Sequence, residues 1–429
     1  MNNNSKTALL LSNYAQRMER YFYAFEKHNI CLLHSHFDKY DEKTLPVEPP
    51  NIIVVDLTET KAYTVEHENI VKLIRAQYPM HTIPVLALLK SVIDEMSEQF
   101  DSILLQPIHA DQIAMRANSL IRLSQMQREI TLRLHTLSQN FNEVPPLPQL
   151  GDKHRFSILF IGKATPKFMV IINALQDKNV SVVAAFTSFT AFDYLYEKNF
   201  DAVVMNGLGT IELAYSITET MRKNAKLYHV PALLLVDKKT FDDCDTVYKV
   251  GMNDIIDTSV SLDEISARIL EQANFHRTHK HLKHRFQTLG SVTVIDQETG
   301  LFNQHFFNAH MRRVSDVYSK LGKPVTLALI RFTSKTPQDK LTESAFKQIG
   351  SMIRNLVRME DTPARLDANI FAIAFMGHTV AQLKPVHERL SSILKCAIIA
   401  HPETGAPMQM NMEITFNALT EQIQRSNVA

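Results

Sequence analysis

Short apolar runs alternate with amphipathic stretches along the first 125 residues of the chain. The runs cover residues 7–11, 30–34, 51–57, 83–89 and 102–105. Apolar runs of this length, separated by segments with helical spacing, are typical of βα units that build a parallel sheet. Five such strands predict one doubly wound α/β domain.

From about residue 110 the apolar positions follow helical spacing. The series runs through Leu120, Leu123, Ile130, Leu134 and Leu137 at intervals of three and four, and Gln127 is the one polar residue at a position of this series. Residues 142–152 contain three prolines and one glycine, which cannot continue a helix. We therefore expect the last helix to extend beyond its domain and a linker to follow it.

A second series of apolar runs repeats the first. It covers residues 157–161, 180–184, 201–205, 230–236 and 254–256, and a helical stretch over about 262–289 follows. The repetition predicts a second domain of the same α/β class. Two extended terminal helices suit side-by-side packing in a homodimer, although a helix lying on its own domain also fits the pattern.

The pattern changes again after Gly290. An apolar strand at 324–332, a helix at about 343–358 and a hairpin-like segment at 364–375 predict an α+β domain. The expected domains are residues 1–140 and 154–289, each with an extended terminal helix, and a C-terminal domain at 290–429. Residues 141–153 form the expected linker.

Composition narrows the possible functions. Lys plus Arg number 46 and Asp plus Glu number 45, so the net charge of +1 gives no strong signal for nucleic-acid binding. No apolar run approaches the roughly 18–20 residues that span a membrane, and the polar N-terminus lacks a signal-peptide layout, so we expect a cytoplasmic protein. The three cysteines are widely spaced and indicate neither a disulfide framework nor a structural metal.

Two segments of the C-terminal domain carry the most specific pattern. Residues 296–303 read DQETGLFN and resemble the D-x-LTGL-x-N opening of GGDEF domains. Residues 358–371 read RMEDTPARLDANIF and fall in register with the RxxD-xxx-R-x-GGDEF segment of that family. Nearly the whole chain resembles PleD-like and PopA-like signalling proteins of bacteria. In these proteins two CheY-like, flavodoxin-like receiver domains precede a GGDEF domain with a nucleotidyl-cyclase-like fold.

The resemblance implies a phosphorylation site in each receiver, but most of its residues are replaced. Asp56 stands at the acceptor position of the first receiver, where Mg²⁺ and a lysine would stabilise the transferring phosphoryl group. The residues that assist phosphoryl transfer in the family are replaced in this chain. Ser12 and Asn13 replace the acid pair, Leu89 replaces the hydroxyl residue and Gln106 replaces the lysine. In that setting Asp56 is either a polar strand end that caps the next loop or a phosphoacceptor.

The second receiver lacks the acceptor itself. Asn206 replaces the aspartate, and the helper positions hold Gly162, Lys163, Val236 and Thr258. We expect two pseudo-receivers, whose surfaces dimerise and dock partner proteins.

The resemblance also implies that the reaction of the GGDEF family is lost. Joining two GTP molecules into cyclic di-GMP needs acids that hold two metal ions. The signature positions hold Asp367, Ala368, Asn369, Ile370 and Phe371, and Arg331 stands where an aspartate is expected. The segment at 333–344 lacks the guanine-reading pattern, and the domain is expected to be shortened at its C-terminus. We therefore expect a protein that is not an enzyme, with no cofactor and no metal.

A ligand site of the family is retained. Arg358 and Asp361 match the RxxD inhibitory site that binds cyclic di-GMP, and Arg389 corresponds by ungapped spacing to a second arginine of that site. A guanidinium can bond to guanine O6 and N7, and a carboxylate can accept from guanine N1 and N2. The alternative is a solvated ion pair at a helix end, since Arg313 and Asp316 form a second RxxD without register.

A basic stretch at 276–285 contains four histidines. A metal site there would need a carboxylate or a further convergent ligand, so a solvated helix between domains is the preferred interpretation. Three functional hypotheses remain: a non-catalytic cyclic di-GMP effector that docks proteins, a nucleotide-independent scaffold, and a response regulator phosphorylated at Asp56.

Overall fold

The structure is a computed structural model. It describes residues 6–13, 18–37, 46, 48–59, 65–79, 81–91, 99–145, 155–178, 180–209, 211–334, 343–395, 399–400, 407–408 and 410–419. The chain forms two compact units. The receiver unit comprises Ser5–Ser124 and Gln149–His281, and the C-terminal unit comprises Gln125–Pro148 and Leu282–Ala429.

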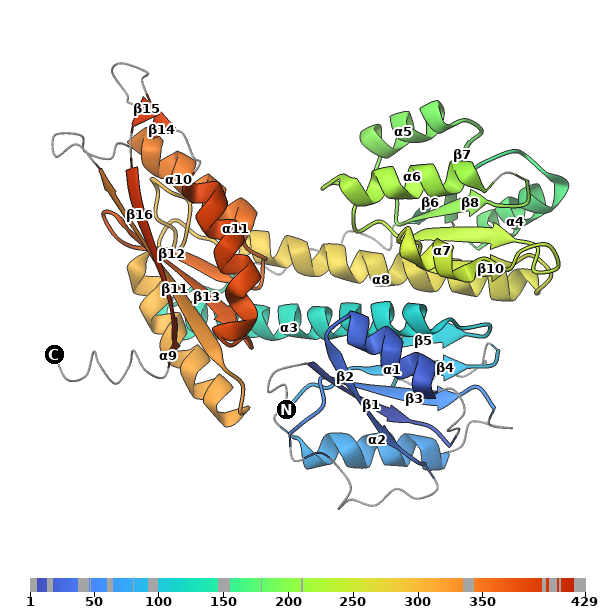
Figure 1. Cartoon of the computed structure of the whole chain (residues 1–429), viewed down its shortest axis with the longest axis horizontal. Coiled ribbons are helices and arrows are strands. Elements are labelled where there is room, and N and C mark those ends of the chain that lie inside the picture. The colour runs from blue at the N-terminus through green and yellow to red at the C-terminus, as the bar shows by residue number, and fades with distance from the viewer. Residues whose placement is uncertain are drawn as a thin grey trace. The chain divides into compact units, whose positions relative to one another are not determined.

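A five-stranded parallel sheet organises the first half of the receiver unit (Figure 1). Its strands are β1 (Lys6–Leu11), β2 (Ile30–Ser35), β3 (Ile52–Leu57), β4 (Val85–Leu89) and β5 (Ser102–Leu105). The helices are α1 (Met18–Lys27), α2 (Val65–Gln77) and the first part of α3 (Ala110–Phe141). The strand order β2-β1-β3-β4-β5 is that of the flavodoxin-like fold, to which CheY belongs.

A second parallel sheet repeats this order. Its strands are β6 (Phe156–Ile161), β7 (Val180–Ala185), β8 (Ala202–Asn206), β9 (Ala232–Val236) and β10 (Asp254–Asp257), in the order β10-β9-β8-β6-β7. The helices are α4 (Pro166–Gln176), α5 (Ser188–Glu197), α6 (Glu212–Lys223), α7 (Cys244–Lys249) and α8 (Leu262–Thr288). The predicted duplication of a doubly wound α/β fold is confirmed.

The central strands explain why the apolar runs predict this fold. Every residue of β3 and of β8 is buried, because helices cover both faces of each sheet. The predicted strand at 230–236 begins later than expected, at Ala232, because Pro231 precedes it and cannot donate to the ladder.

The two sheets of the receiver unit are joined through α3 and α8, which lie between them in Figure 1. The guanidinium of Arg116 on α3 lies 4.2 Å from the ring centroid of Phe275 on α8. Arg268 on α8 pairs with Asp254 at 2.7 Å and donates to the main-chain oxygen of Gln106 at 3.1 Å. Contacts within one chain therefore use part of the helix surface that we expected to lie in a homodimer interface. The homodimer stays a prediction.

The C-terminal unit is built on an antiparallel sheet of order β12-β13-β11-β16. Its elements are α9 (Gln304–Lys320), β11 (Val325–Ser334), α10 (Glu343–Leu356), β12 (Thr362–Asp367), β13 (Ile370–Met376), η3 (Ala381–Leu383), α11 (Lys384–Lys395) and β16 (Met410–Ala418). The two-residue strands β14 (Ile399–Ala400) and β15 (Pro407–Met408) pair separately. Helices α10 and α11 pack on one face of the four-stranded sheet through Phe346, Ile349, Leu390 and Leu394. The predicted α+β domain is confirmed.

One predicted boundary is wrong. The helix expected over about 343–358 ends at Leu356, so Arg358 lies in the turn that follows it. Polar contacts of this turn, described below, hold the chain out of the helix. No helix among the described residues is long and apolar enough to cross a membrane. The predicted linker beyond residue 145 and the end of the chain beyond residue 419 lie outside the described residues, and the predicted domain boundaries stay a prediction.

Candidate functional site

The turn between α10 and β12 contains the predicted ligand residues Arg358 and Asp361. The main-chain N–H of Arg358 donates to Asp361 Oδ2 at 2.8 Å. The main-chain N–H of Asp361 donates in return to the main-chain oxygen of Arg358 at 3.2 Å. These two bonds close the turn, and they leave the Arg358 side chain exposed.

Arg389 reaches the same turn from α11. Its Nη2 donates to the main-chain oxygen of Leu356 at 2.9 Å, which satisfies one of the last carbonyls of α10. Arg389 is itself exposed. The structure thus brings the three predicted ligand residues, which are 31 positions apart at most, to one helix end.

Asp361 differs from the two arginines because its side chain is buried. Burial and the neighbouring charge of Glu360 raise the pKa of the Asp361 carboxyl to about 7. The hydrogen bond from the Arg358 N–H opposes this shift and favours the charged form. In this conformation the carboxyl is buried, whereas the side chains of Arg358 and Arg389 are exposed.

A buried polar network lies directly behind the turn and includes the second half of α3. Arg133 Nη2 donates to the main-chain oxygen of Asp361 at 2.9 Å and to Thr362 Oγ1 at 3.0 Å. Arg133 Nε donates to Glu129 Oε1 at 2.7 Å. The same carboxylate oxygen accepts from Thr362 Oγ1 at 3.1 Å and lies 3.0 Å from His310 Nε2 on α9.

The network is fully enclosed. Glu129, Arg133 and His310 are all buried, and Thr136 Oγ1 lies 3.0 Å from His310 Nδ1. Burial raises the pKa of Glu129, but the charges and hydrogen bonds of Arg133 and His310 outweigh burial and leave the pKa below its ordinary value. Glu129 is therefore a paired buried carboxylate that ties α3 to the ligand turn.

Sequence reasoning missed this network, although two signals were present. Glu129 and Arg133 have the i,i+4 spacing of a helical ion pair, and they flank the apolar position Ile130. His310 falls among apolar residues at helical spacing, between Phe306 and Val314. The first signal usually marks a solvated ion pair, and the second usually marks a histidine in the core. Only the fold therefore reveals that Glu129 and His310 are in contact.

The turn that corresponds to the GGDEF signature is a tight hairpin. Ala368 and Asn369 connect β12 to β13, and Asp367 is exposed at the end of β12. Arg331 of β11 lies opposite Ile370 and also opposite Glu413 of β16. Among the described residues, this hairpin holds no group of three side chains that could share a metal ion. Most of the predicted guanine-reading segment, residues 335–342, lies outside the described residues.

The opening motif at 296–303 makes structural contacts. Asp296 Oδ1 accepts from the Thr299 N–H at 2.9 Å and from Thr299 Oγ1 at 2.7 Å. Arg365 of β12 pairs with Asp296 at 3.3 Å. Asn303 caps α9 by accepting from the Phe306 N–H at 2.9 Å. These residues therefore hold the start of the domain against the sheet.

Asp56 lies at the end of β3 with its carboxylate occupied by local donors. Oδ1 accepts from the Thr58 N–H at 3.1 Å and from Thr58 Oγ1 at 2.7 Å, and Oδ2 accepts from Ser12 Oγ at 3.3 Å. Asp56 is buried. This is the loop-capping arrangement that the sequence offered as the alternative to a phosphoacceptor.

Asn206 makes the same turn in the second sheet. Its Oδ1 accepts from the Leu208 N–H at 3.0 Å, and its Nδ2 donates to the main-chain oxygen of Lys163 at 2.7 Å. The amide therefore reproduces the capping bond of Asp56 and adds a donor, which a carboxylate lacks.

Comparison with curated proteins finds similarity to a response regulator that is present in two strains of one bacterium. The chain is 22% identical over 195 residues to the response regulator PleD of Caulobacter vibrioides, and the alignment covers 44% of this chain and 43% of PleD. The chain thus spans less than half the length of the curated relative that it matches. No protein-family model matches the chain.

Each of several solved structures matches about a third of the chain. The GGDEF domain of FimX from Pseudomonas aeruginosa is 21% identical with a TM-score of 0.28, covering 32% of this chain and 90% of that domain. The GGDEF domain of DgcB from Caulobacter crescentus, in complex with c-di-GMP, is 14% identical with a TM-score of 0.28, covering 33% of this chain and 86% of that chain. A response regulator from Chloroflexus aurantiacus is 16% identical with a TM-score of 0.27, covering 28% of this chain and 98% of that chain. The assignment of the fold rests on the strand orders described above.

Proposed function

We propose that this protein is a non-catalytic effector of cyclic di-GMP, which binds the dinucleotide at Arg358, Asp361 and Arg389. The observation that carries the proposal is that Arg389 reaches the end of α10, close in the chain to Arg358, and that both arginines are exposed. Arg389 bonds to the carbonyl of Leu356, two residues before Arg358. Paired guanidinium groups suit the O6 and N7 edge of guanine and the phosphates of a dinucleotide.

The non-catalytic part of the proposal is supported by the hairpin of β12 and β13. Ile370 stands where a metal-binding acid is needed, and Arg331 brings a positive charge to the neighbouring strand. A cation beside the reacting phosphates opposes metal binding at that position. We expect no diguanylate cyclase activity and no resident cofactor.

Binding at the turn would act on the chain through Arg133. This side chain holds the main-chain oxygen of Asp361 and the hydroxyl of Thr362. A ligand that draws Asp361 outward changes these bonds and hence the packing of α3 in the C-terminal unit. The two pseudo-receivers would then present altered surfaces to partner proteins, in a cytoplasmic homodimer.

The test is a calorimetric titration of the full chain with cyclic di-GMP. We expect saturable binding at micromolar concentration or tighter, and at least a tenfold loss in Arg358→Ala and in Arg389→Ala. Lys347→Ala is the matched control, because Lys347 is an exposed cation in α10 that lies more than one turn before the C-terminal end of this helix at Leu356. The control should bind as the wild type does.

GTP in excess tests the alternative use of the site. Competition by GTP would indicate a general nucleotide site, whereas unchanged binding supports recognition of the dinucleotide. Absence of heat in the wild type would overturn the effector proposal and favour a nucleotide-independent scaffold.

A further inference from the structure

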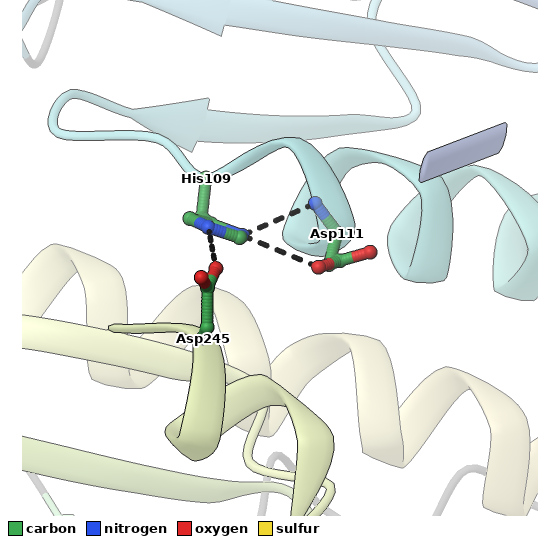
Figure 2. Close-up of side chains that lie close together, drawn as sticks. All are labelled: His109, Asp111 and Asp245. Carbon is green, nitrogen blue, oxygen red and sulfur yellow. Dashed lines mark hydrogen bonds and ion pairs between the residues drawn. The ribbon is translucent and has the colours of Figure 1, made fainter. Parts of the chain in front are cut away.

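A cluster of one histidine and two aspartates lies in the receiver unit (Figure 2). His109 directly precedes α3, Asp111 is in the first turn of α3, and Asp245 is in the first turn of α7. His109 Nε2 lies 2.9 Å from Asp245 Oδ1, and His109 Nδ1 lies 3.7 Å from Asp111 Oδ2. Figure 2 shows Asp111 to the right of the imidazole ring and Asp245 below it.

The imidazole ring is held in place by its surroundings. It stacks on Tyr248 of α7, with ring centroids 4.9 Å apart and an interplanar angle of 17°. Tyr248 is itself buried. Lys27 of α1 pairs with Asp111 Oδ1 at 3.2 Å, so it is the other oxygen of Asp111 that faces His109. Two of the three groups are therefore oriented before any ion binds.

We propose that His109, Asp111 and Asp245 bind a divalent transition-metal ion of the Zn²⁺ class. One imidazole nitrogen and two carboxylate oxygens are donors that Zn²⁺ accepts, and three protein ligands leave a fourth position for water. The three ligand atoms lie within 4.8 Å of one another. Bonds of about 2.0–2.2 Å allow two ligands of one ion to be up to about 4.4 Å apart, so a small movement closes the site.

Asp245 is the group that can make this movement. Its side chain is 90% exposed, whereas the His109 ring is fixed by Tyr248. Bound Zn²⁺ would replace the direct contact of His109 with Asp245 by two metal bonds. Mg²⁺ should not compete, because it prefers an octahedral set of oxygen ligands and keeps its water.

The site would join the two parallel sheets of the receiver unit. His109 and Asp111 follow β5 of the first sheet, and Asp245 follows β9 of the second sheet. An ion that binds only when the two sheets are packed together stabilises that packing by mass action. Zn²⁺ would thus raise the melting temperature of the receiver unit.

The experiment titrates the full chain with ZnCl₂ by calorimetry, in buffer with millimolar MgCl₂. We expect one saturable site in the wild type, and binding at least about tenfold weaker in His109→Gln and in Asp245→Asn. Zn²⁺ should raise the melting temperature of the wild type and not that of Asp245→Asn. Asp245→Asn tests the site even if His109→Gln fails to fold, since Asp245 is on the surface.

The matched control is the double variant His281→Ala with His284→Ala. These two histidines are exposed and lie in the basic stretch of α8, whereas His279 of the same stretch is half-buried and His276 is buried. The control should keep the binding. The proposal would be overturned if the wild type does not bind Zn²⁺ or if the control variant loses the binding. It would also be overturned if both site variants bind Zn²⁺ as tightly as the wild type does.

Discussion

At the scale of single residues, Asp361 joins the candidate ligand turn to the interior. Its carboxyl has a pKa raised to about 7 by burial and by Glu360, against an ordinary value of 3.8. Between about pH 4 and pH 7 the folded protein therefore binds one more proton at this group than the unfolded chain. The contribution of Asp361 to the free energy of unfolding is largest at low pH and is lost as the pH rises through this window.

Asp361→Asn removes this titration. We expect the difference in unfolding free energy between wild type and variant to shift by about 1 kcal/mol per pH unit between pH 5 and pH 7, with the wild type losing stability as the pH rises. Urea unfolding at several pH values measures it. The opposite trend from Glu129, whose pKa is lowered, cancels because both proteins contain that residue. A constant difference would show that Asp361 is ionised throughout.

The same carboxyl links ligand binding to pH. Accepting hydrogen bonds from guanine N1 and N2 requires the charged form of Asp361. We expect the affinity for cyclic di-GMP to rise up to about tenfold from pH 6 to pH 8, because the pKa is about 7. Calorimetry at the two pH values measures the change. Equal affinities would mean that the two arginines bind the ligand without this carboxyl.

At the scale of elements, the second half of α3 is held to the C-terminal unit by the Glu129 and Arg133 pair. Arg133→Met leaves the Glu129 carboxylate buried beside His310 without its guanidinium partner. We expect a loss of about 3–5 kcal/mol in the free energy of unfolding, which urea denaturation measures.

Two further variants define the origin of that loss. Adding Glu129→Leu to Arg133→Met removes the stranded charge and should restore a large part of the stability. Gln127→Ala on the exposed face of α3 should change stability by no more than about 0.5 kcal/mol. A double variant as unstable as Arg133→Met alone would assign the loss to packing of the arginine stem.

The strand ends of β3 and β8 give a test of the pseudo-receiver assignment. The capping bond that Asp56 accepts from Thr58 is reproduced by Asn206 in the second sheet. We expect Asp56→Asn to keep stability within about 1 kcal/mol and Asp56→Ala to cost about 1–2 kcal/mol more. Intact mass after treatment with acetyl phosphate and Mg²⁺ should show no phosphoryl adduct, and an adduct lost in Asp56→Asn would restore the response-regulator hypothesis.

At the scale of the whole molecule, the predicted homodimer can use only those helix surfaces that are not already packed within one chain. Arg116 packs on Phe275 within the receiver unit, so this part of α3 and α8 is used inside one chain. We expect Arg116→Ala to lower the melting temperature and to leave the oligomeric state unchanged in sedimentation velocity. A shift from dimer to monomer in this variant would return these helices to the dimer interface.

The fold class is the part that the sequence by itself determined. Strands buried on both faces need continuous apolar runs, and the two sets of five runs therefore identify two parallel sheets. The hairpin of β12 and β13 and the long helix α3 were also readable, because their signals are local. Arg358 and Asp361 were predicted as ligand residues by their register with the GGDEF family and Arg389 by ungapped spacing, and this role stays a prediction.

The tertiary structure alone decided what surrounds those residues. Sequence spacing put Arg358 in a helix, but α10 ends at Leu356, and Arg358 lies in the following turn, where its main-chain N–H donates to Asp361 Oδ2. Thr362 and Arg133 are 229 positions apart, and no local pattern indicates that they touch. Burial of charged groups depends on what packs over them, because desolvation is set by neighbours from distant parts of the chain. For the same reason, the approach of Asp245 to His109 and the raised pKa of Asp361 follow from the fold and not from the order of residues.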